Sequence, residues 1–303
     1  MQFLKFIFCT TMHVLKNWYV WRMNWNEQPM IRVAILDLYE GAENQGMRCI
    51  REILNQFAEY NNLELHKDEF EVRLNREIPD LSYDIYISSG GPGSPLDSEG
   101  SLWEKKYFEW LTQVETFNAA EENPVKKQVF LICHSFQLVC RHYDLAEVIK
   151  RKSTAFGVFP MHYLRDAEDE PIFKGLRDPF YAVDSRDYQA IEPRHQKIKA
   201  MGATILAIEK NRPHVALERA IMAIRFNENM IGTQFHPEAD AVGMTLHLLK
   251  DDKKKTVIDN HGEEKWQSMI EQLNDPDKIL FTYSRVLPNF LQHAVDRMHL
   301  VEV

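Results

Sequence analysis

Val129-Phe130-Leu131-Ile132-Cys133-His134-Ser135-Phe136-Gln137 joins a short apolar run to a segment whose apolar residues recur at helical spacing. The run that precedes Cys133 is typical of a buried strand, and the residues that follow it indicate a helix. Cys133 therefore lies at a strand-to-helix turn, where the helix dipole and free N–H groups favour thiolate over thiol. The sequence predicts an α/β arrangement with a nucleophilic cysteine at this junction.

A glycine-rich loop follows a second predicted strand. Tyr83-Asp84-Ile85-Tyr86-Ile87-Ser88 indicates the strand, and Ser89-Gly90-Gly91-Pro92-Gly93-Ser94 comes directly after it. Glycines let the backbone turn tightly and bring bare N–H groups close to a substrate, as an oxyanion hole requires. The same residues are common in ordinary turns, so the loop alone does not establish a site.

A base and a carboxylate stand two residues apart in Gln234-Phe235-His236-Pro237-Glu238, after the apolar run Met230-Ile231-Gly232. In an extended segment, residues i and i+2 project to the same side, so His236 and Glu238 can share one edge of a site. An imidazole works as a general base when one ring nitrogen faces the nucleophile and an acceptor holds the other. We interpret His236 as the base for Cys133 and Glu238 as its orienter.

Taken in this order, the three motifs resemble those of the class I glutamine amidotransferase family. Its members carry a Ser-Gly-Gly-Pro-type loop, a Gly-x-Cys-x-Gly-x-Gln elbow and a Gln-Phe-His-Pro-Glu segment, and the resemblance spans about residues 31–249. The chain looks like a stand-alone glutaminase domain of the GMP synthase type. The resemblance implies a flavodoxin-like α/β domain over residues 30–249, with a mainly parallel sheet and helices on both faces, followed by a helical C-terminal extension over 250–303.

The resemblance also implies roles for individual residues. Cys133 would attack the γ-carboxamide of glutamine, and His236, oriented by Glu238, would pass the thiol proton to the leaving ammonia. The backbone N–H groups of Gly91 and His134 would receive the oxyanion. The full set implied to bind the oxyanion or the substrate is Gly90, Gly91, His134 and Gln137.

The resemblance implies no cofactor and leaves the ammonia acceptor open. The chain has neither the Gly-x-x-x-x-Gly-Lys pattern of phosphate-binding loops nor the Ser-Gly-Gly-x-Asp-Ser signature of the ATP-using synthetase domains that some family members carry. Any acceptor would therefore lie on another chain, a possible synthetase partner.

The elbow departs from the family pattern at two positions, because Leu131 and Ser135 stand where glycine is usual. Serine is small, but Leu131 needs a hollow beneath the elbow, or Cys133 is displaced. An altered pocket is expected in either case. Three alternatives stay open: a γ-glutamyl hydrolase or homoserine acyltransferase on the same scaffold, a catalytically inactive regulatory module, or a structural Cys133 beside a surface His236 and Glu238.

A further departure concerns Val183-Asp184-Ser185-Arg186-Asp187-Tyr188, where many family members have a Ser-His pair that helps to seat the substrate. Arg186 stands in the place of the histidine. It could bind a substrate carboxylate bidentately, but a surface ion pair with Asp184 or Asp187 is the interpretation we favour.

Composition narrows the protein class. With 303 residues, 45% of them hydrophobic and 27% charged, the chain is long enough for one sizeable globular domain. The formal net charge of −9 argues against nucleic acid as a partner. Four cysteines without paired spacing predict neither a metal site nor a disulfide framework, as suits the cytoplasm. Of these, Cys49 and Cys140 lie on the apolar faces of predicted helices, so we expect them to be core residues.

The two ends of the chain need separate treatment. Residues 1–29 are aromatic and basic, but they suit neither a signal peptide nor a membrane span, and Met30 directly precedes the first predicted strand, Ile31–Leu36. We expect translation to begin at Met30, with residues 1–29 an artefact or a disordered extension. Near the other end, Glu263–Leu273 and Pro288–Met298 are predicted helices.

Overall fold

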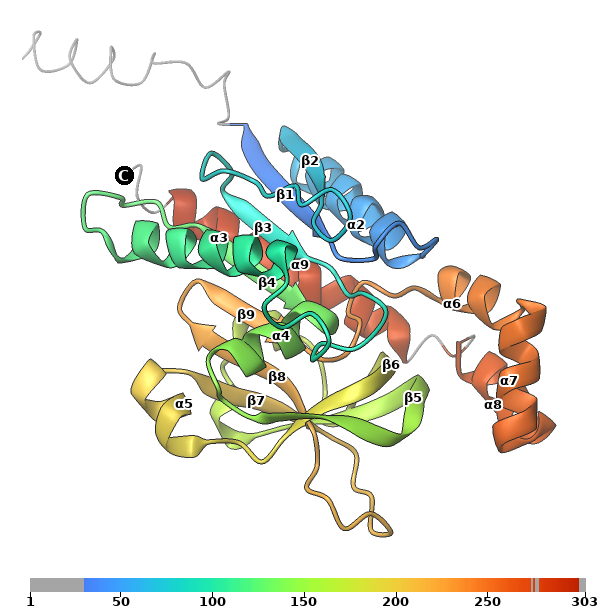
Figure 1. Ribbon diagram of the computed structural model, residues 1–303. Coiled ribbons are helices and arrows are strands. Elements are labelled where there is room, and N and C mark those ends of the chain that lie inside the picture. The colour runs from blue at the N-terminus through green and yellow to red at the C-terminus, as the bar shows by residue number, and fades with distance from the viewer. Residues whose placement is uncertain (1–29, 274, 276–277, 300–303) are drawn as a thin grey trace, which may run out of the picture.

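One nine-stranded sheet runs through the part of the chain that the computed structural model describes, residues 30–273, 275 and 278–299 (Figure 1). The strand order is β2-β1-β3-β4-β9-β8-β7-β5-β6. The strands are β1 (Ile31–Asp37), β2 (Leu65–Glu71), β3 (Ile85–Ser88), β4 (Gln128–Ile132), β5 (Glu147–Tyr163), β6 (Phe180–Ile191), β7 (Thr204–Glu209), β8 (Ile221–Asn227) and β9 (Met230–Thr233).

Eight α-helices and two short 3₁₀ turns, η1 (Arg165–Ala167) and η2 (Pro171–Phe173), accompany the sheet in the described residues. The helices are α2 (Gly46–Asn61), α3 (Leu102–Ala119), α4 (His134–His142), α5 (His195–Met201), α6 (Ala241–Leu248), α7 (Asp251–His261), α8 (Glu263–Leu273) and α9 (Ile279–His299).

The sheet has two halves of different kinds. β2, β1, β3, β4 and β9 pair in parallel, and we call them the parallel half. The antiparallel half consists of β8, β7, β5 and β6, and β8 joins it to β9. The predicted α/β class is confirmed, and residues 147–227 continue the same sheet with antiparallel strands.

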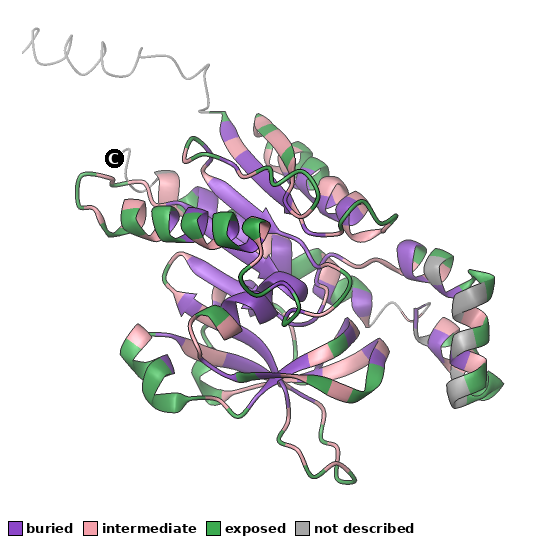
Figure 2. Cartoon of the chain, viewed as in Figure 1, coloured by how far each residue is buried: buried purple, intermediate pink, exposed green. Residues whose placement is uncertain are grey.

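Strand residues alternate between two buried layers. In β1, Val33 and Ile35 pack with α2 and α9, whereas Ala34 and Leu36 pack with α3 and α4 on the other face. Because both faces are covered, β1 reads as a continuous apolar run. Figure 2 shows the same division, with buried residues along the central strands and exposed residues on the outer sides of the helices.

Two elements begin where the sequence gives no clear signal. The edge strand β2 carries many charged residues, so it has no apolar run to detect. The helix expected from Pro288 begins at Ile279, so the proline lies inside α9. A proline there loses a backbone hydrogen bond, but Leu287 and Leu291 beside it are fully buried, and their packing offsets the loss.

Within the segment after residue 249, α9 is part of the main core, whereas α7 and α8 pack in a separate apolar cluster. α9 contributes to the same apolar cluster as α2 and β4, and the rings of Phe130 and Phe290 lie 5.0 Å apart. The boundary at residue 249 stays a prediction, and the expectation for residues 1–29 lies outside the described residues. No helix in the described part of the chain combines the length and apolar character needed to cross a bilayer.

Candidate active site

Cys133 occupies a sharp turn between β4 and α4. Its backbone has φ 48° and ψ −93°, a conformation that residues other than glycine rarely adopt. The N–H of Cys133 donates to the Thr233 carbonyl at the end of β9, 2.7 Å away, and its carbonyl accepts from the N–H of Gln137, 3.0 Å away. The turn is thus held from the neighbouring strand and from its own helix.

The space that the Leu131 side chain requires is provided by β9, the neighbour of β4 in the sheet. Leu131 pairs with Gly232 of β9, and a Cβ on Gly232 would lie 3.1 Å from the Cβ of Leu131. The same added atom would lie 3.0 Å from Phe136 and 3.1 Å from Phe226. A glycine on β9 therefore accommodates the leucine on β4, and the elbow keeps its form.

Ser135 ties the elbow to the sheet. Its buried hydroxyl accepts a hydrogen bond from the Ile132 N–H at 2.8 Å. The carbonyl oxygens of Ser88 and Ile132, at 2.9 and 3.0 Å, are its possible acceptors. The serine in place of glycine thus makes contacts that a glycine could not.

His236 and Glu238 are joined by a hydrogen bond. Nδ1 of His236 lies 2.8 Å from Oε1 of Glu238, and the Glu238 side chain is 1% exposed. His236 makes a single β-bridge with Val183, after which His236–Ala239 form a turn. The predicted contact is present, but a turn brings the two side chains together rather than an extended strand. Glu238 is buried and the His236 side chain is only 13% exposed, so neither is a surface residue.

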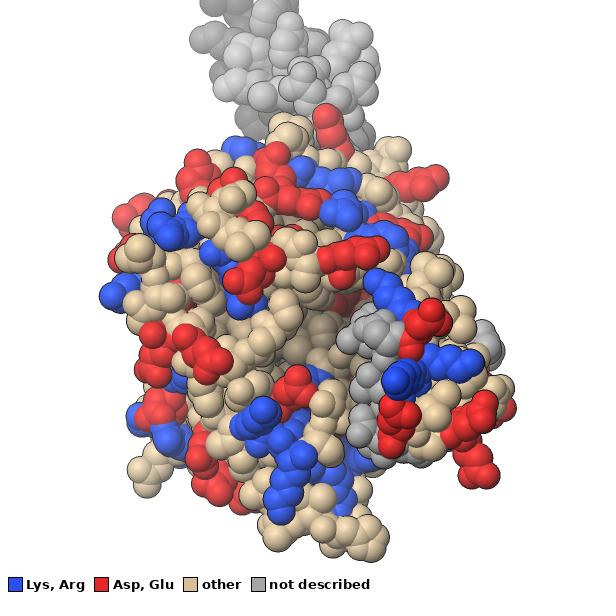
Figure 3. All heavy atoms as spheres, turned by 45° about the vertical axis from the view of Figure 1, so that its right-hand side comes forward, with Lys and Arg blue, Asp and Glu red and all other residues tan. Residues whose placement is uncertain are grey.

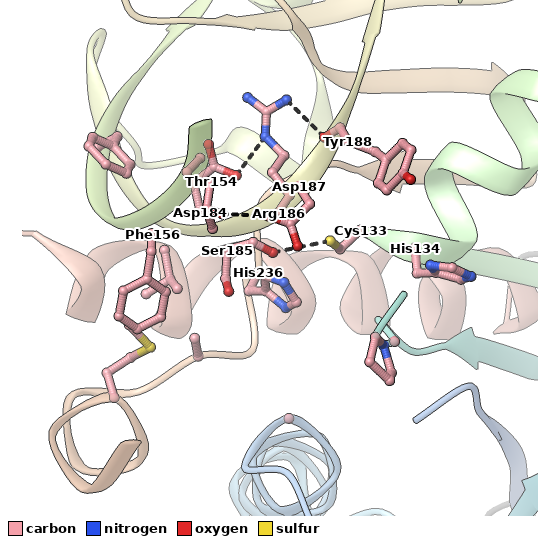
Figure 4. Close-up of a pocket in the computed structure, with 18 of the residues that line it drawn as sticks. Cys133, His134, Thr154, Phe156, Asp184, Ser185, Arg186, Asp187, Tyr188 and His236 are labelled. Carbon is pink, nitrogen blue, oxygen red and sulfur yellow. Dashed lines mark hydrogen bonds and ion pairs between the residues drawn. The ribbon is translucent and has the colours of Figure 1, made fainter. Parts of the chain in front are cut away.

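The electrostatics of His236 favour the imidazolium. Burial opposes the charge, but the negative charges of Glu238 and Cys133, with a hydrogen bond to each, raise the pKa of His236 well above its ordinary value. Cys133 Sγ lies 3.7 Å from the Ser185 carbonyl, the contact drawn in Figure 4. Gln234 donates its amide N–H to the same sulfur at 3.5 Å.

The two loop glycines meet different neighbours. A Cβ on Gly90 would lie 2.9 Å from Cε1 of His236 and 3.6 Å from Cβ of Cys133. A Cβ on Gly91 would lie 2.4 Å from the Leu38 carbonyl oxygen. Gly90 therefore leaves room for the imidazole, and Gly91 lets the loop lie against the end of β1.

The two N–H groups predicted to receive an oxyanion belong to Gly91 and His134, which both line the cavity around Cys133. His134 is the first residue of α4, so its N–H has no partner within the helix. Its side chain is buried, and burial, with the charges of Arg73 and Arg141, lowers the pKa of His134 to about 3. The ring of His134 is therefore neutral.

Gln137 differs from its expected role. Its amide nitrogen donates to the Tyr188 carbonyl at 3.0 Å and to Oε1 of Gln234 at 2.9 Å. Gln234 in turn donates to Cys133 Sγ. Although Gln137 lines the cavity, its donors are engaged with protein acceptors, so it positions Gln234 beside the thiol.

Tyr39 is a neighbour of the site that the motifs did not reveal. Its hydroxyl would lie 2.3 Å from a Cβ on Gly46 and 3.3 Å from a Cβ on Gly90, so two glycines make room for it. Burial, followed by the charges of Glu238 and Cys133, raises the pKa of Tyr39 well above its ordinary value. The available signal was its place just after β1, at the same edge of the sheet as the other motifs.

Arg186 is engaged in ion pairs, but not at the surface. Its Nε donates to Asp184 at 2.8 Å (Figure 4). Its Nη2 donates to Glu209 at 3.1 Å. The Arg186 side chain is 1% exposed. The favoured partner, Asp184, is confirmed, but the pair is buried because β6 carries both residues into the wall of the cavity.

One cavity of about 1190 Å³ connects these groups. Cys133, His134, Gln137, His236 and Glu238 all line it. The other two cysteines in the described residues have packing surroundings, as expected: burial raises the pKa of Cys49 to about 12 and that of Cys140 further. Cys9 lies outside the described residues.

Comparisons with known proteins agree with this geometry. The family model described as glutamine amidotransferase class-I matches residues 35–255. None of the curated proteins matches the chain.

Two solved structures share the fold. The protein SMU.1228c superposes with a TM-score of 0.58 at 17% identity, over 88% of this chain and 100% of that one. A glutamine amidotransferase from Thermotoga maritima superposes with a TM-score of 0.59 at 15% identity, over 88% of this chain and 99% of that one.

Proposed function

Because the chain belongs to the class-I glutamine amidotransferase family, we propose that it hydrolyses the side-chain amide of glutamine with Cys133 as nucleophile, His236 as acid and base, and Glu238 as the orienter of His236. The observation that carries the proposal is the 2.8 Å contact between His236 Nδ1 and Glu238 Oε1 beside the strained elbow of Cys133. The contact fixes which ring nitrogen is left for the thiol.

The first half of the reaction forms a thioester. His236 holds the proton of the Cys133 thiol as an imidazolium, the thiolate attacks the amide carbon, and the carbonyl oxygen takes the negative charge. The backbone N–H groups of Gly91 and His134 would stabilise that charge. His236 then donates its proton to the amide nitrogen, the C–N bond breaks, and ammonia leaves.

The second half regenerates the enzyme. His236, now neutral, accepts a proton from water as the water attacks the thioester carbon, and the C–S bond breaks to release glutamate. The Glu238 carboxylate holds the imidazole in one orientation through both halves. The net change is glutamine and water to glutamate and ammonia.

The deciding assay measures ammonia and glutamate release from glutamine by wild type and by Cys133→Ala. We expect stoichiometric release from wild type and loss of turnover in the variant, because the thioester cannot form. Cys140→Ala is the matched control, since Cys140 is a buried thiol on the same helix that lies outside the cavity. Equal rates in wild type and a folded Cys133→Ala protein would refute the proposal.

We also propose the finer type, a glutaminase of the GMP synthase kind that delivers ammonia to an acceptor on another chain. Its support is the complete Gln-Phe-His-Pro-Glu segment at residues 234–238. Affinity purification of the tagged full chain tests it: we expect an amine-accepting synthetase to co-purify and to raise glutaminase turnover. Full activity with no such partner would contradict ammonia delivery and leave hydrolysis intact.

A second candidate is hydrolysis of a γ-glutamyl amide larger than glutamine. The cavity of about 1190 Å³ favours it, because pockets that bury drug-sized ligands occupy about 300–1,000 Å³ and glutamine is far smaller than such ligands. The same chemistry would apply, with an amine in place of ammonia as the leaving group.

A further inference from the structure

The cavity continues well past Cys133 along the antiparallel half of the sheet. It is lined there by β5, β6, β7 and the segment after β7. Figure 3 shows the cavity as a hollow in the surface, with Lys and Arg side chains gathered along its lower rim. We call the side chains of Arg151, Lys152 and Arg212 the basic wall.

The basic wall is organised around one buried carboxylate, Glu209. Nη1 of Arg151 lies 3.4 Å from Glu209 Oε2, and Nη2 of Arg212 pairs with Glu209 Oε1. Arg186 reaches Oε2 from the cavity side, and the Ala220 N–H donates to Oε1 at 2.8 Å. Both carboxylate oxygens are therefore fully engaged, and the carboxylate cannot neutralise every cation around it.

The charges on this side of the cavity do not balance. Among the described residues, three guanidinium groups, those of Arg151, Arg186 and Arg212, share the two buried carboxylates of Asp184 and Glu209. One positive charge is thus in excess. Asp184 is taken by Arg186, and Asp187 accepts from the Thr154 hydroxyl. The excess therefore falls on the basic wall.

The excess charge is partly removed from water. The side chains of Arg151 and Arg212 are only 10% and 15% exposed, and Nε of Arg212 is buried without a hydrogen-bond partner. Burial and the charge of Arg186 lower the pKa of Arg151, as expected where cations crowd together. A desolvated cation favours an anionic partner, and the guanidinium fork matches a carboxylate in particular.

The opposite side of the cavity is balanced in charge. The carboxylates that line it, those of Glu43, Glu238 and Asp240, are paired with Lys250, His236 and Arg48. An anionic group in the cavity is therefore drawn to the basic wall more than to that side.

We infer that the preferred substrate is a γ-glutamyl amide whose amine portion carries a carboxylate, and that this carboxylate binds the basic wall while Cys133 attacks the amide. The inference rests on the proposed function and specifies its substrate. The thiolate attacks the γ-carbonyl carbon, the C–N bond breaks, and the amine leaves with the proton from His236. Water then releases glutamate from the thioester, so one amide and one water give glutamate and one amine.

The test compares substrates that differ in charge. Glutamate release is measured from γ-glutamyl-glutamate and γ-glutamyl-glycine, which carry the carboxylate, and from γ-glutamyl-glycinamide, which does not. We expect kcat/KM for γ-glutamyl-glycine to exceed that for γ-glutamyl-glycinamide by about tenfold or more, the effect of one charge-assisted contact. Equal values for the charged and neutral compounds would overturn the inference.

Substitutions in the basic wall test whether the preference for charged substrates arises there. Lys152→Gln and Arg212→Gln should each lower the ratio of kcat/KM for γ-glutamyl-glycine to kcat/KM for γ-glutamyl-glycinamide. Lys152 is exposed, so its replacement keeps the fold even if loss of Arg212 disturbs it. Lys106→Gln, an exposed cation on α3, is the matched control and should change neither value. A charge preference that survives in both basic-wall variants would contradict the assignment.

A binding measurement separates this inference from the proposed function. Calorimetry with Cys133→Ala should give tighter binding of γ-glutamyl-glutamate than of glutamine, and Lys152→Gln in the same background should remove the difference. Hydrolysis of glutamine without any charge preference would overturn only the inference. Binding with charge preference but no hydrolysis of any amide by wild type would overturn the proposed function and leave the basic wall only as a site that binds carboxylates.

Discussion

The parallel and antiparallel halves of the sheet contribute to the cavity in different ways. Every predicted reacting group follows a parallel strand at its carboxyl end: the glycine loop after β3, Cys133 after β4 and His236 after β9. The antiparallel half contributes the basic wall and the buried Arg186. Carboxyl ends of parallel strands meet at one edge of a sheet, which is why short motifs far apart in sequence can assemble there.

The difference implies that the parallel half provides the chemistry and the antiparallel half selects the substrate, which can be tested by experiment. Changes in the parallel half should affect all amide substrates alike, because every substrate uses the same reacting groups. Changes in the antiparallel half should affect the choice among substrates. A variant in one half that behaves like a variant in the other would contradict this division.

The largest effect is expected for His236→Asn. Asparagine cannot relay a proton, so turnover should fall by about 10²–10⁴-fold, the usual contribution of general acid–base catalysis. The fall should be the same for glutamine and for γ-glutamyl-glutamate, measured as kcat for each. A loss confined to one substrate would place His236 in recognition instead.

The second-largest loss of turnover is expected for Gly90→Ala. Gly232→Ala, a glycine-to-alanine change in the core, serves as the comparison. The Cβ added at residue 90 meets the ring of His236 at 2.9 Å, so the base must shift, and a displacement on the order of 1 Å can cost roughly 10²-fold in turnover. The Cβ added at residue 232 meets Phe136 and Leu131 in the core, which should cost about 1–3 kcal/mol of stability.

Turnover assays and urea unfolding on both glycine variants give the comparison. Gly90→Ala should lose activity with little loss of stability, and Gly232→Ala should lose stability first. The reverse pattern would mean that the space around His236 is not limiting.

Tyr39→Phe should have a smaller effect. The hydroxyl remains protonated because the pKa of Tyr39 is raised by burial and by the charges of Glu238 and Cys133, so it can act only as a donor toward anionic groups. Loss of one such hydrogen bond, about 0.5–1.5 kcal/mol, corresponds to a roughly 2- to 12-fold fall in kcat/KM. Tyr60→Phe, at a tyrosine that is 90% exposed, is the control. Equal activity of both variants would remove Tyr39 from the site.

The smallest effect expected is a pH dependence of stability. The folded state raises the pKa of His236, so its protonated form contributes stability in full below the unfolded value of about 6.5 and loses it as pH rises through the raised pKa. The unfolding free energy of wild type minus that of His236→Asn should therefore shrink as pH rises above about 6.5. Urea unfolding at a series of pH values measures it, and a difference that grows with pH would have the wrong sign.

The positions of the proposed reacting groups could be predicted from the sequence because each lies in a short local motif. Cys133 follows an apolar run, and His236 and Glu238 stand two residues apart, so the contacts within each motif are nearly fixed by the chain. Leu131 was harder to interpret, because the space for it is provided by Gly232, about a hundred residues later.

The basic wall was not predicted for a similar reason. Arg151 on β5 and Arg212 after β7 meet only because both reach Glu209, and no short motif contains such a contact. Arg186 was expected at the surface because its segment is polar, and β6 buries it instead. Antiparallel pairing across long separations produces contacts that a local pattern does not encode.

Covalent labelling tests most directly whether the carboxyl ends of the parallel strands provide the chemistry. The chain is treated with the diazoketone analogue of glutamine, 6-diazo-5-oxo-norleucine, and the adduct is located by intact mass and peptide mapping. We predict one adduct per chain, on Cys133, with none on Cys49 or Cys140, whose thiol pKa values are raised by burial. An adduct on another cysteine, or glutamine turnover that continues while Cys133 stays unlabelled and no adduct forms, would contradict the assignment of Cys133 as the nucleophile.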